Sequence, residues 1–350
     1  MSSWLSFLAS RGARLDAAGV ADFGDPAGEA LAARDHAILA DLSHNALLAA
    51  TGDGASAFLH GQFTNDVQAL QPGAAQWNGW CSPKGRLIAT FLLMCRAEGF
   101  LLMLPAELAP PVAKRLGLFV LRSKVRVAEA SASFVRLGFA GKTAGVIIAR
   151  HWGFTPDPLR SVEKDGATCV AIDGERFVIL VAPERAPPLW ETLALNATPA
   201  GPDAWEGSLV RAGIPTIVAA TQEAFVPQMA NFDLVGGVSF KKGCYPGQEI
   251  VARTQYRGIL KRRMALVHLA GESRPMPGQS VYGAAFGDQA AGTIANVALA
   301  PGGGFDALVV AQVESIAADD LRWASPGGPR LEIRPLPYAV EPWESPAERA

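Results

Sequence analysis

Two pairs of apolar segments in this chain are each separated by a connection of only a few residues. The first pair spans residues 86–96 and 100–104, and the second spans 168–172 and 176–181, with Asp173-Gly174 in its turn. An Asp-Gly pair favours the tight turn of a β-hairpin. Because parallel strands need a crossover of about a dozen residues or more, both pairs are predicted to be antiparallel hairpins. A regularly alternating parallel sheet is therefore not expected.

Segments with helical spacing of apolar residues alternate with these strands. The pattern of three to four residues between apolar positions is typical of helices that cover one face of a sheet. Strands and helices that follow one another in this irregular way favour the α+β class, with helices layered on antiparallel sheets. The predicted helices are residues 28–42, 54–63, 113–118, 188–195 and 204–212, and a further strand is predicted at 45–50.

The character of the sequence changes after Arg263, where short strand-like segments are separated by Gly and Pro clusters. This pattern predicts a small C-terminal β-barrel. Its strands are expected at residues 264–269, 280–282, 292–297, 308–313 and 331–333.

The domain organisation follows from these segments. We expect an α+β region over residues 1–262, made of two interleaved subdomains of which residues 50–130 form roughly the second. The barrel is expected over residues 263–336. Residues 337–350 combine prolines with charges and are predicted to be an extended or disordered tail.

The composition excludes two kinds of partner. The chain of 350 residues has a formal net charge of −2, so direct binding of nucleic acid is not expected. A membrane-spanning helix needs about 20 consecutive apolar residues, but the best candidate, residues 88–95, is bracketed by Arg86 and Arg96. The sequence predicts a soluble protein without membrane contact.

The four cysteines, Cys81, Cys95, Cys169 and Cys244, are widely spaced and contain no Cys-x-x-Cys pair. This spacing predicts free thiols in a reducing compartment, which is the cytoplasm in a bacterium or the mitochondrial matrix in a eukaryote. The first three lie in or beside apolar or aromatic runs and are predicted to pack in the core. The histidines lack ligand spacing, so no metal site is predicted.

Cys244 has a different sequence neighbourhood. Lys241 and Lys242 precede it, and Gly243 and Gly247 flank it. The glycines allow the backbone to approach closely, and the lysines favour the thiolate form. Cys244 is therefore the first candidate for chemistry or cofactor contact, and the alternative is a thiol that fills a turn under the barrel.

Two apparent nucleotide-binding motifs are rejected. Residues 52–57 resemble a dinucleotide fingerprint, but no acidic residue follows about 20 residues later on a second parallel strand, where ribose recognition needs it. Residues 141–143 resemble the end of a phosphate-binding loop, but Arg136 stands where the first glycine is required. Nucleotide hydrolysis is not predicted.

Several short segments, continuous around Cys244, carry the pattern of a known family. They are residues 42–44, 58–67, 82–86, 211–215, 225–233, 236–240 and 242–253. Together they resemble the YgfZ-type folate-binding proteins. The resemblance covers most of residues 30–300, and its Lys-Gly-Cys-Tyr-x-Gly-Gln-Glu core at residues 242–249 is specific to that family.

The resemblance implies an aminomethyltransferase-like, folate-binding fold of antiparallel sheets and helices followed by a small C-terminal β-barrel. It implies tetrahydrofolate or a one-carbon derivative as cofactor. It also implies a role as an accessory protein in the assembly or repair of iron-sulfur proteins, with clients such as radical tRNA-modifying enzymes. Cys244 is the functional thiol that the family pattern implies.

One departure separates the chain from the related aminomethyltransferase, the glycine-cleavage T-protein. That family carries an Asp-Asp pair in its first long hairpin strand, and the matching residues 85–90 around Ile88 contain no acid. Acid-base assistance from that strand is therefore not expected. A folate-dependent one-carbon transferase with an unknown substrate stays as the alternative function, and an interaction protein with a vestigial folate cleft is a third interpretation.

The candidate folate-binding residues follow from the chemistry of the ligand. A pterin ring presents donors that an amide or carboxylate accepts, and the glutamate tail needs Arg or Lys. Tyr245 either stacks on the ligand or packs in the protein, and Asp66 either contacts ligand or caps a turn. The candidates for cofactor binding are Lys242, Gly243, Tyr245, Gly247, Gln248, Glu249, Arg253, Asn231 and Asp66, with Cys244 as the functional thiol.

Overall fold

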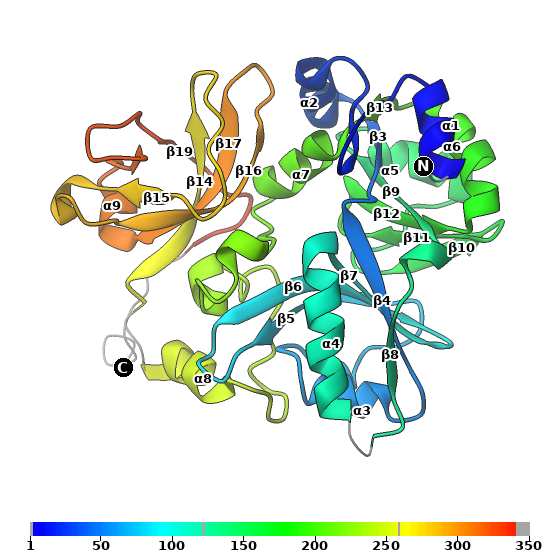
Figure 1. Ribbon diagram of the computed structural model, residues 1–350, viewed down its shortest axis with the longest axis horizontal. Coiled ribbons are helices and arrows are strands. Elements are labelled where there is room, and N and C mark those ends of the chain that lie inside the picture. The colour runs from blue at the N-terminus through cyan, green and yellow to red at the C-terminus, as the bar shows by residue number, and fades with distance from the viewer. Residues whose placement is uncertain (1–2, 121–122, 258–259, 341–350) are drawn as a thin grey trace.

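The computed structural model describes residues 3–120, 123–257 and 260–340, and it contains three large sheets with helices packed on their faces (Figure 1). Nearly all neighbouring strands in these sheets run antiparallel. The α+β class predicted from the hairpins is confirmed. Within the described ranges, no helix is long and apolar enough to cross a bilayer.

The first sheet has six strands, in the order β10-β11-β12-β9-β3-β13. Strand β13 runs parallel to β3, and the other neighbours are antiparallel. The bounds are β10 Ser161–Lys164, β11 Ala167–Ala171, β12 Arg176–Val181, β9 Val135–Ala140, β3 Ile38–Asp41 and β13 Thr198–Ala200. A separate two-stranded ribbon consists of β1 Arg14–Asp16 and β2 Gly19–Asp22.

Helices cover both faces of the first sheet. One face packs its core around Trp4 and Trp190, and the other packs Trp205 against β9. Gly138 on β9 is required there, because a Cβ atom at this position would lie 2.5 Å from the Trp205 ring. The helices are α1 Ser3–Ser10, α5 Ala144–Trp152 and α6 Ala186–Ala194 on the first face, and α2 Pro26–Asp35 and α7 Pro202–Arg211 on the second.

The second sheet is a five-stranded antiparallel sheet in the order β5-β6-β7-β4-β8. Every residue of β6 except Arg96 is buried, because its two faces belong to different cores. Phe91 and Leu93 pack toward the third sheet, whereas Leu92 and Met94 pack toward the first. The bounds are β4 Asn45–Thr51, β5 Ala75–Cys81, β6 Leu87–Arg96, β7 Gly99–Pro105 and β8 Arg126–Glu129, with helices α3 Ala55–His60 and α4 Ala109–Val120.

The third sheet is a curled, six-stranded sheet near the C-terminus, in the order β18-β15-β16-β17-β14-β19. Its side chains alternate between two cores with the period of two that strands impose. Leu308 and Val310 face the second sheet, and Val309 and Ala311 face the inside of the curl. The predicted C-terminal barrel is therefore found as this curled sheet. The bounds are β14 Arg262–Leu269, β15 Ser280–Tyr282, β16 Gly292–Leu299, β17 Phe305–Gln312, β18 Arg322–Trp323 and β19 Glu332–Arg334, with helix α9 Val313–Ala317.

A segment between α7 and β14 connects the first two sheets to the third, and it carries helix α8 Gln248–Arg257. Arg263 at the start of β14 pairs with Asp233 of this segment, and the Nη1 to Oδ1 distance is 2.8 Å. Asn231 adopts a left-handed backbone conformation with φ of 52°, which Asn tolerates better than most residues. Its Nδ2 donates to the carbonyl of Met264 over 2.9 Å. These contacts hold the segment against the curled sheet.

One predicted helix is wrong in its second half. The helical pattern at residues 28–42 overlaps α2, but the helix begins at Pro26 and ends at Asp35, and β3 Ile38–Asp41 follows. All residues of β3 are buried between β9 and β13, and a short apolar run buried on both faces has no periodicity that separates strand from helix. Within the predicted tail, the Tyr338 hydroxyl donates to the Gly213 carbonyl over 2.7 Å, and residues 341–350 lie outside the described residues.

Candidate functional site

The motif around Cys244 folds against the end of α3, and we call the group of Lys242, Cys244, Tyr245, His60 and Asp66 the thiol cluster. Lys242 is 8% exposed, and its Nζ donates to the carbonyls of His60 and Phe63, the latter over 2.8 Å. The same ammonium group lies 4.7 Å from the centre of the Tyr245 ring. Two carbonyls and a ring face therefore hold one cation beside the thiol.

Burial changes the acid-base properties of this lysine. Desolvation lowers the pKa of Lys242 to about 8, and the nearby Asp66 and Cys244 partly oppose this shift. Because the charged form costs free energy in a buried site, a lysine in this state holds its proton less firmly than one in water. Lys242 is therefore able to give up or take a proton near neutral pH, next to an exposed thiol.

The four cysteines divide as the sequence predicted. Cys244 is exposed, whereas Cys81, Cys95 and Cys169 are buried. Burial raises the pKa of Cys81 to about 12 and also raises the pKa of Cys169 and Cys95. Since the thiolate is the nucleophile, only Cys244 combines exposure with a nearby cation among these four.

We expect an alkylating reagent to modify one thiol per native chain, and mass mapping should place it at Cys244. Modification of Cys81 and Cys169 requires opening of the core, so their rates should be more than about 1000-fold slower. The denatured chain, in which all four cysteines react, is the control. Equal rates at Cys244 and Cys81 in the native protein would contradict this assignment.

Two glycines make the local fold of the motif possible. Gly247 has φ of +80°, and a Cβ atom there would lie 2.3 Å from the carbonyl oxygen of Ser82. Gly85 has φ of +69°, and its Cβ atom would lie 2.8 Å from Cβ of Ile250. The turn at residues 82–85 and the start of α8 thus dock through positions that only glycine fits. Two segments singled out in the sequence, 82–86 and 242–253, are neighbours in the structure.

His60 is a member of the thiol cluster that the sequence did not indicate. Its Nδ1 lies 3.2 Å from Oδ1 of Asp66, and a Cβ atom at Gly243 would lie 3.6 Å from its Nε2. Asp66 also accepts from the amide of Ala69 over 3.1 Å, so this carboxylate caps a turn and faces the histidine at once. The signal for His60 was its position within the segment 58–67, because its spacing to other histidines shows no pattern.

The remaining residues that the sequence predicted as cofactor ligands are either buried or lie on α8. Tyr245 is buried, and burial raises its pKa, so the ring packs within the protein. Gln248 reaches the carbonyl of Lys242 only over 3.5 Å. Glu249 and Arg253 are exposed on α8. Asn231 is fully buried at the third sheet, where its side-chain amide donates to the carbonyl of Met264 and accepts from the backbone amide of the same residue. Within the described ranges, no three His, Cys, Asp or Glu side chains form a group that would hold a metal ion.

A second candidate site, the central cleft, lies where the three sheets meet and has a volume of about 580 Å³. Each sheet layer contributes to its wall: Asn45 of β4, Glu206 of α7 and Asn296 of β16. None of the candidate residues predicted from the sequence lines it. The lining residues are Ala18, Ser43, His44, Asn45, Pro105, Ala106, Glu107, Pro202, Asp203, Glu206, Val210, Thr216, Val218, Arg274, Pro277, Asn296 and Val297.

Several polar and charged side chains that line the central cleft pair with one another. Nε2 of His44 lies 2.9 Å from Oε1 of Glu206 and 2.9 Å from Nδ2 of Asn45. Arg274 pairs with Asp203 at the same wall. Nδ1 of His44 is buried and has no hydrogen-bond partner among the described residues. The exposed surface of the cleft is mainly apolar, and an apolar surface with convergent polar groups is the usual form of a small-molecule site.

Comparisons with known proteins agree on the fold. The family model for the GCVT N-terminal domain matches residues 22–156. Curated relatives named tRNA-modifying protein YgfZ include one from Cronobacter sakazakii, 30% identical over 322 residues, which covers 90% of this chain and 97% of the relative. Another, from Photobacterium profundum, is 36% identical over 257 residues and covers 71% and 75%. The solved aminomethyltransferase T of the glycine cleavage system from Bartonella henselae superposes with a TM-score of 0.77 at 19% identity, over 95% of this chain and 96% of that one.

Proposed function

This chain belongs to the YgfZ family, and on that premise we propose that it is a tetrahydrofolate-binding accessory protein for iron-sulfur enzymes, including those that modify tRNA. The observation that carries the proposal is the exposed Cys244 thiol beside the buried Lys242 ammonium. A cation held by carbonyls next to an exposed thiol favours the thiolate. All four cysteines are free thiols, a state that a reducing compartment such as a bacterial cytoplasm maintains.

We propose the central cleft as the folate site, because its residues fit the ligand. Its volume of about 580 Å³ is in the range of cavities that hold small molecules and cofactors. The Glu206 carboxylate would accept from the pterin donors, and the unpartnered Nδ1 of His44 would find a partner there. Arg274 would face a carboxylate of the tail. When bound, a reduced folate supplies a one-carbon unit to the chemistry.

The proposal assigns a separate role to the thiol cluster. Cys244 would hold a sulfur species, a one-carbon adduct or a cluster fragment transiently, with Lys242 stabilising the anion. Since an iron-sulfur cluster commonly takes four thiolates, a single cysteine holds a cluster only together with ligands from a client protein. The exposure of Cys244 and of Glu249 and Arg253 on α8 leaves this surface open to such a client.

Replacing Glu206 by glutamine is expected to weaken binding of 5-formyltetrahydrofolate about 10-fold to 100-fold, because a hydrogen bond to a charged group contributes about 1.5–3 kcal/mol. The substitution keeps the size of the side chain but removes its charge and replaces one acceptor oxygen by a donor NH2 group, and binding is measured by calorimetric titration. Lys242→Met is the matched control at the thiol cluster and should bind as the wild type does. The reverse pattern would place the folate beside Cys244, as the sequence alone suggested.

A one-carbon transferase is the alternative function, and the likeness in fold to aminomethyltransferase T favours it. The strand that carries that family's acid pair is β6, where Thr90 here uses its hydroxyl to accept from the amide of Ile217 over 2.9 Å. Thr90 is buried and offers no carboxylate for acid-base assistance. Steady-state consumption of methylenetetrahydrofolate with an amine donor would support the transferase, and its absence would support the accessory role.

A further inference from the structure

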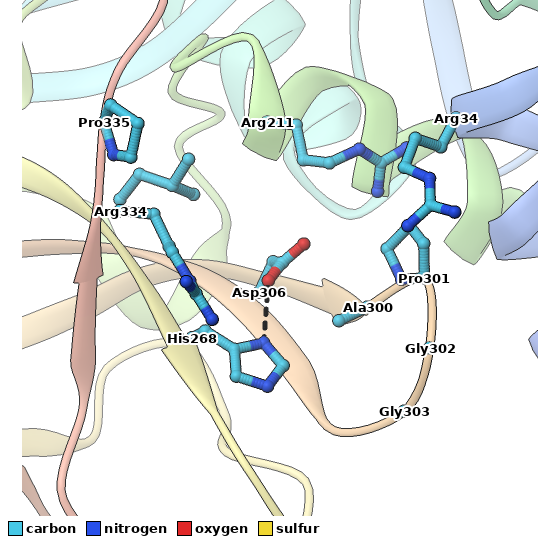
Figure 2. A pocket seen from close by; sticks show the side chains of 11 residues that line it. Arg34, Arg211, His268, Ala300, Pro301, Gly302, Gly303, Asp306, Arg334 and Pro335 are labelled. Carbon is cyan, nitrogen blue, oxygen red and sulfur yellow. Dashed lines mark hydrogen bonds and ion pairs between the residues drawn. The ribbon is translucent and has the colours of Figure 1, made fainter.

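A third cavity, which we call the arginine pocket, lies between α2, α7 and the curled third sheet (Figure 2). Its volume is about 470 Å³. Guanidinium groups from three separate elements face it: Arg34 from α2, Arg211 from the end of α7 and Arg334 from β19. Asp306 and His268 form part of its floor, and the loop after β16 closes one side. The pocket shares no lining residue with the central cleft.

The charges around this pocket are not balanced at Arg211. Arg34 pairs with Asp35 over 2.7 Å and Arg334 with Glu332 over 2.9 Å. The one carboxylate in the wall, that of Asp306, lies 3.0 Å from Nδ1 of the His268 ring. Within the described ranges, Nη1 of Arg211 is buried and has no hydrogen-bond partner. A buried charged donor without an acceptor is unfavourable.

The surroundings of Arg211 oppose its positive charge. Burial lowers the pKa of Arg211, the positive charges of Arg176 and Arg34 lower it further, and Asp306 acts in the opposite direction. Because Gly207, one turn earlier on α7, has no side chain, there is room for the Arg211 guanidinium at this position. A Cβ atom at Gly207 would lie 3.1 Å from Nη1 of Arg211. The fold therefore leaves room for the Arg211 guanidinium at a position where its positive charge is only partly balanced by Asp306.

We propose that the arginine pocket binds a small, doubly charged oxyanion, the phosphate of a monoester or the pair of carboxylates of a short dicarboxylic acid. Planar guanidinium groups from opposite walls match the geometry of such oxygens and bind them through paired hydrogen bonds. The Asp306 carboxylate next to His268 would accept a hydrogen bond from a hydroxyl or amine group of a ligand that carries one. The site requires neither a folate nor Cys244.

Binding is tested on the full chain by calorimetry at constant ionic strength, with inorganic phosphate, glycerol 3-phosphate and succinate as separate probes and chloride as the reference. Saturable binding of a phosphate probe or of succinate is expected, and the preferred probe identifies the source of the anion. Binding to none of them, or binding that chloride reproduces, would overturn the proposal.

Variants separate the pocket from general charge effects. Arg211→Met should weaken binding at least about 10-fold. Gly207→Ala keeps every charge and displaces the guanidinium by only a few tenths of an ångström, so it should weaken binding less than Arg211→Met does. If Arg211→Met does not fold, Arg34→Gln replaces it as the pocket variant, because Arg34 is an exposed residue. Arg150→Met removes an exposed arginine of α5 and should leave binding unchanged. Unaltered binding in the pocket variants, or equal loss in Arg150→Met, would refute the site.

Discussion

A chain with Cys244→Ala is expected to lose the ability to restore tRNA methylthiolation in cells that lack their own YgfZ-type protein, whereas the wild-type chain restores it. The thiol is exposed and lies beside the Lys242 ammonium, and alanine removes the sulfur that this cation stabilises. We expect at least a 10-fold loss of rescue, measured as the modified fraction of tRNA at matched protein levels.

The folded state should not change in this variant. Cys244 is exposed, and substitutions at exposed positions usually shift the free energy of unfolding by less than about 0.5 kcal/mol. Cys244→Ser, which keeps size but not the thiolate, should fail in the same way. Equal rescue by wild type and Cys244→Ala would make the thiol structural, and rescue by neither, with both proteins present, would favour the transferase alternative.

Replacing Arg263 by methionine is expected to lower the free energy of unfolding by about 3–5 kcal/mol, because it leaves the Asp233 carboxylate buried without its partner. The side chains of this pair are 8% and 6% exposed. Arg263 also donates to the carbonyl of Gln228 over 2.7 Å, so the change loosens the segment that joins the first two sheets to the third. The midpoint of urea unfolding measures the effect.

The neighbouring residue supplies a matched control. Arg262 is also on β14 but is only half-buried, so Arg262→Met should change the free energy of unfolding by less than about 1 kcal/mol. Combining Arg263→Met with Asp233→Asn removes both charges and should recover part of the loss. Equal effects of Arg262→Met and Arg263→Met would show that the buried ion pair does not hold the third sheet in place.

Local pattern was sufficient for much of the fold. The hairpin of β6 Leu87–Arg96 and β7 Gly99–Pro105 follows from strand periodicity and turn residues, which act over a few positions. The same signals predict five of the six strands of the curled sheet, and they miss the two-residue strand β18 Arg322–Trp323. The different surroundings of Cys244 and the buried cysteines were also visible in the neighbouring residues. Strand β3 was missed because burial on both faces removes the alternation that identifies a strand.

The sequence by itself determined the fold class, the curled C-terminal sheet and the motif around Cys244, since each depends on residues close together in the chain. The tertiary structure alone decided which distant side chains meet. His44, Glu206 and Asn296 form one cleft, and Arg34, Arg211 and Arg334 form one pocket. These groups converge because burying the apolar faces of three sheets brings their edges together, and no local pattern records where such edges will meet.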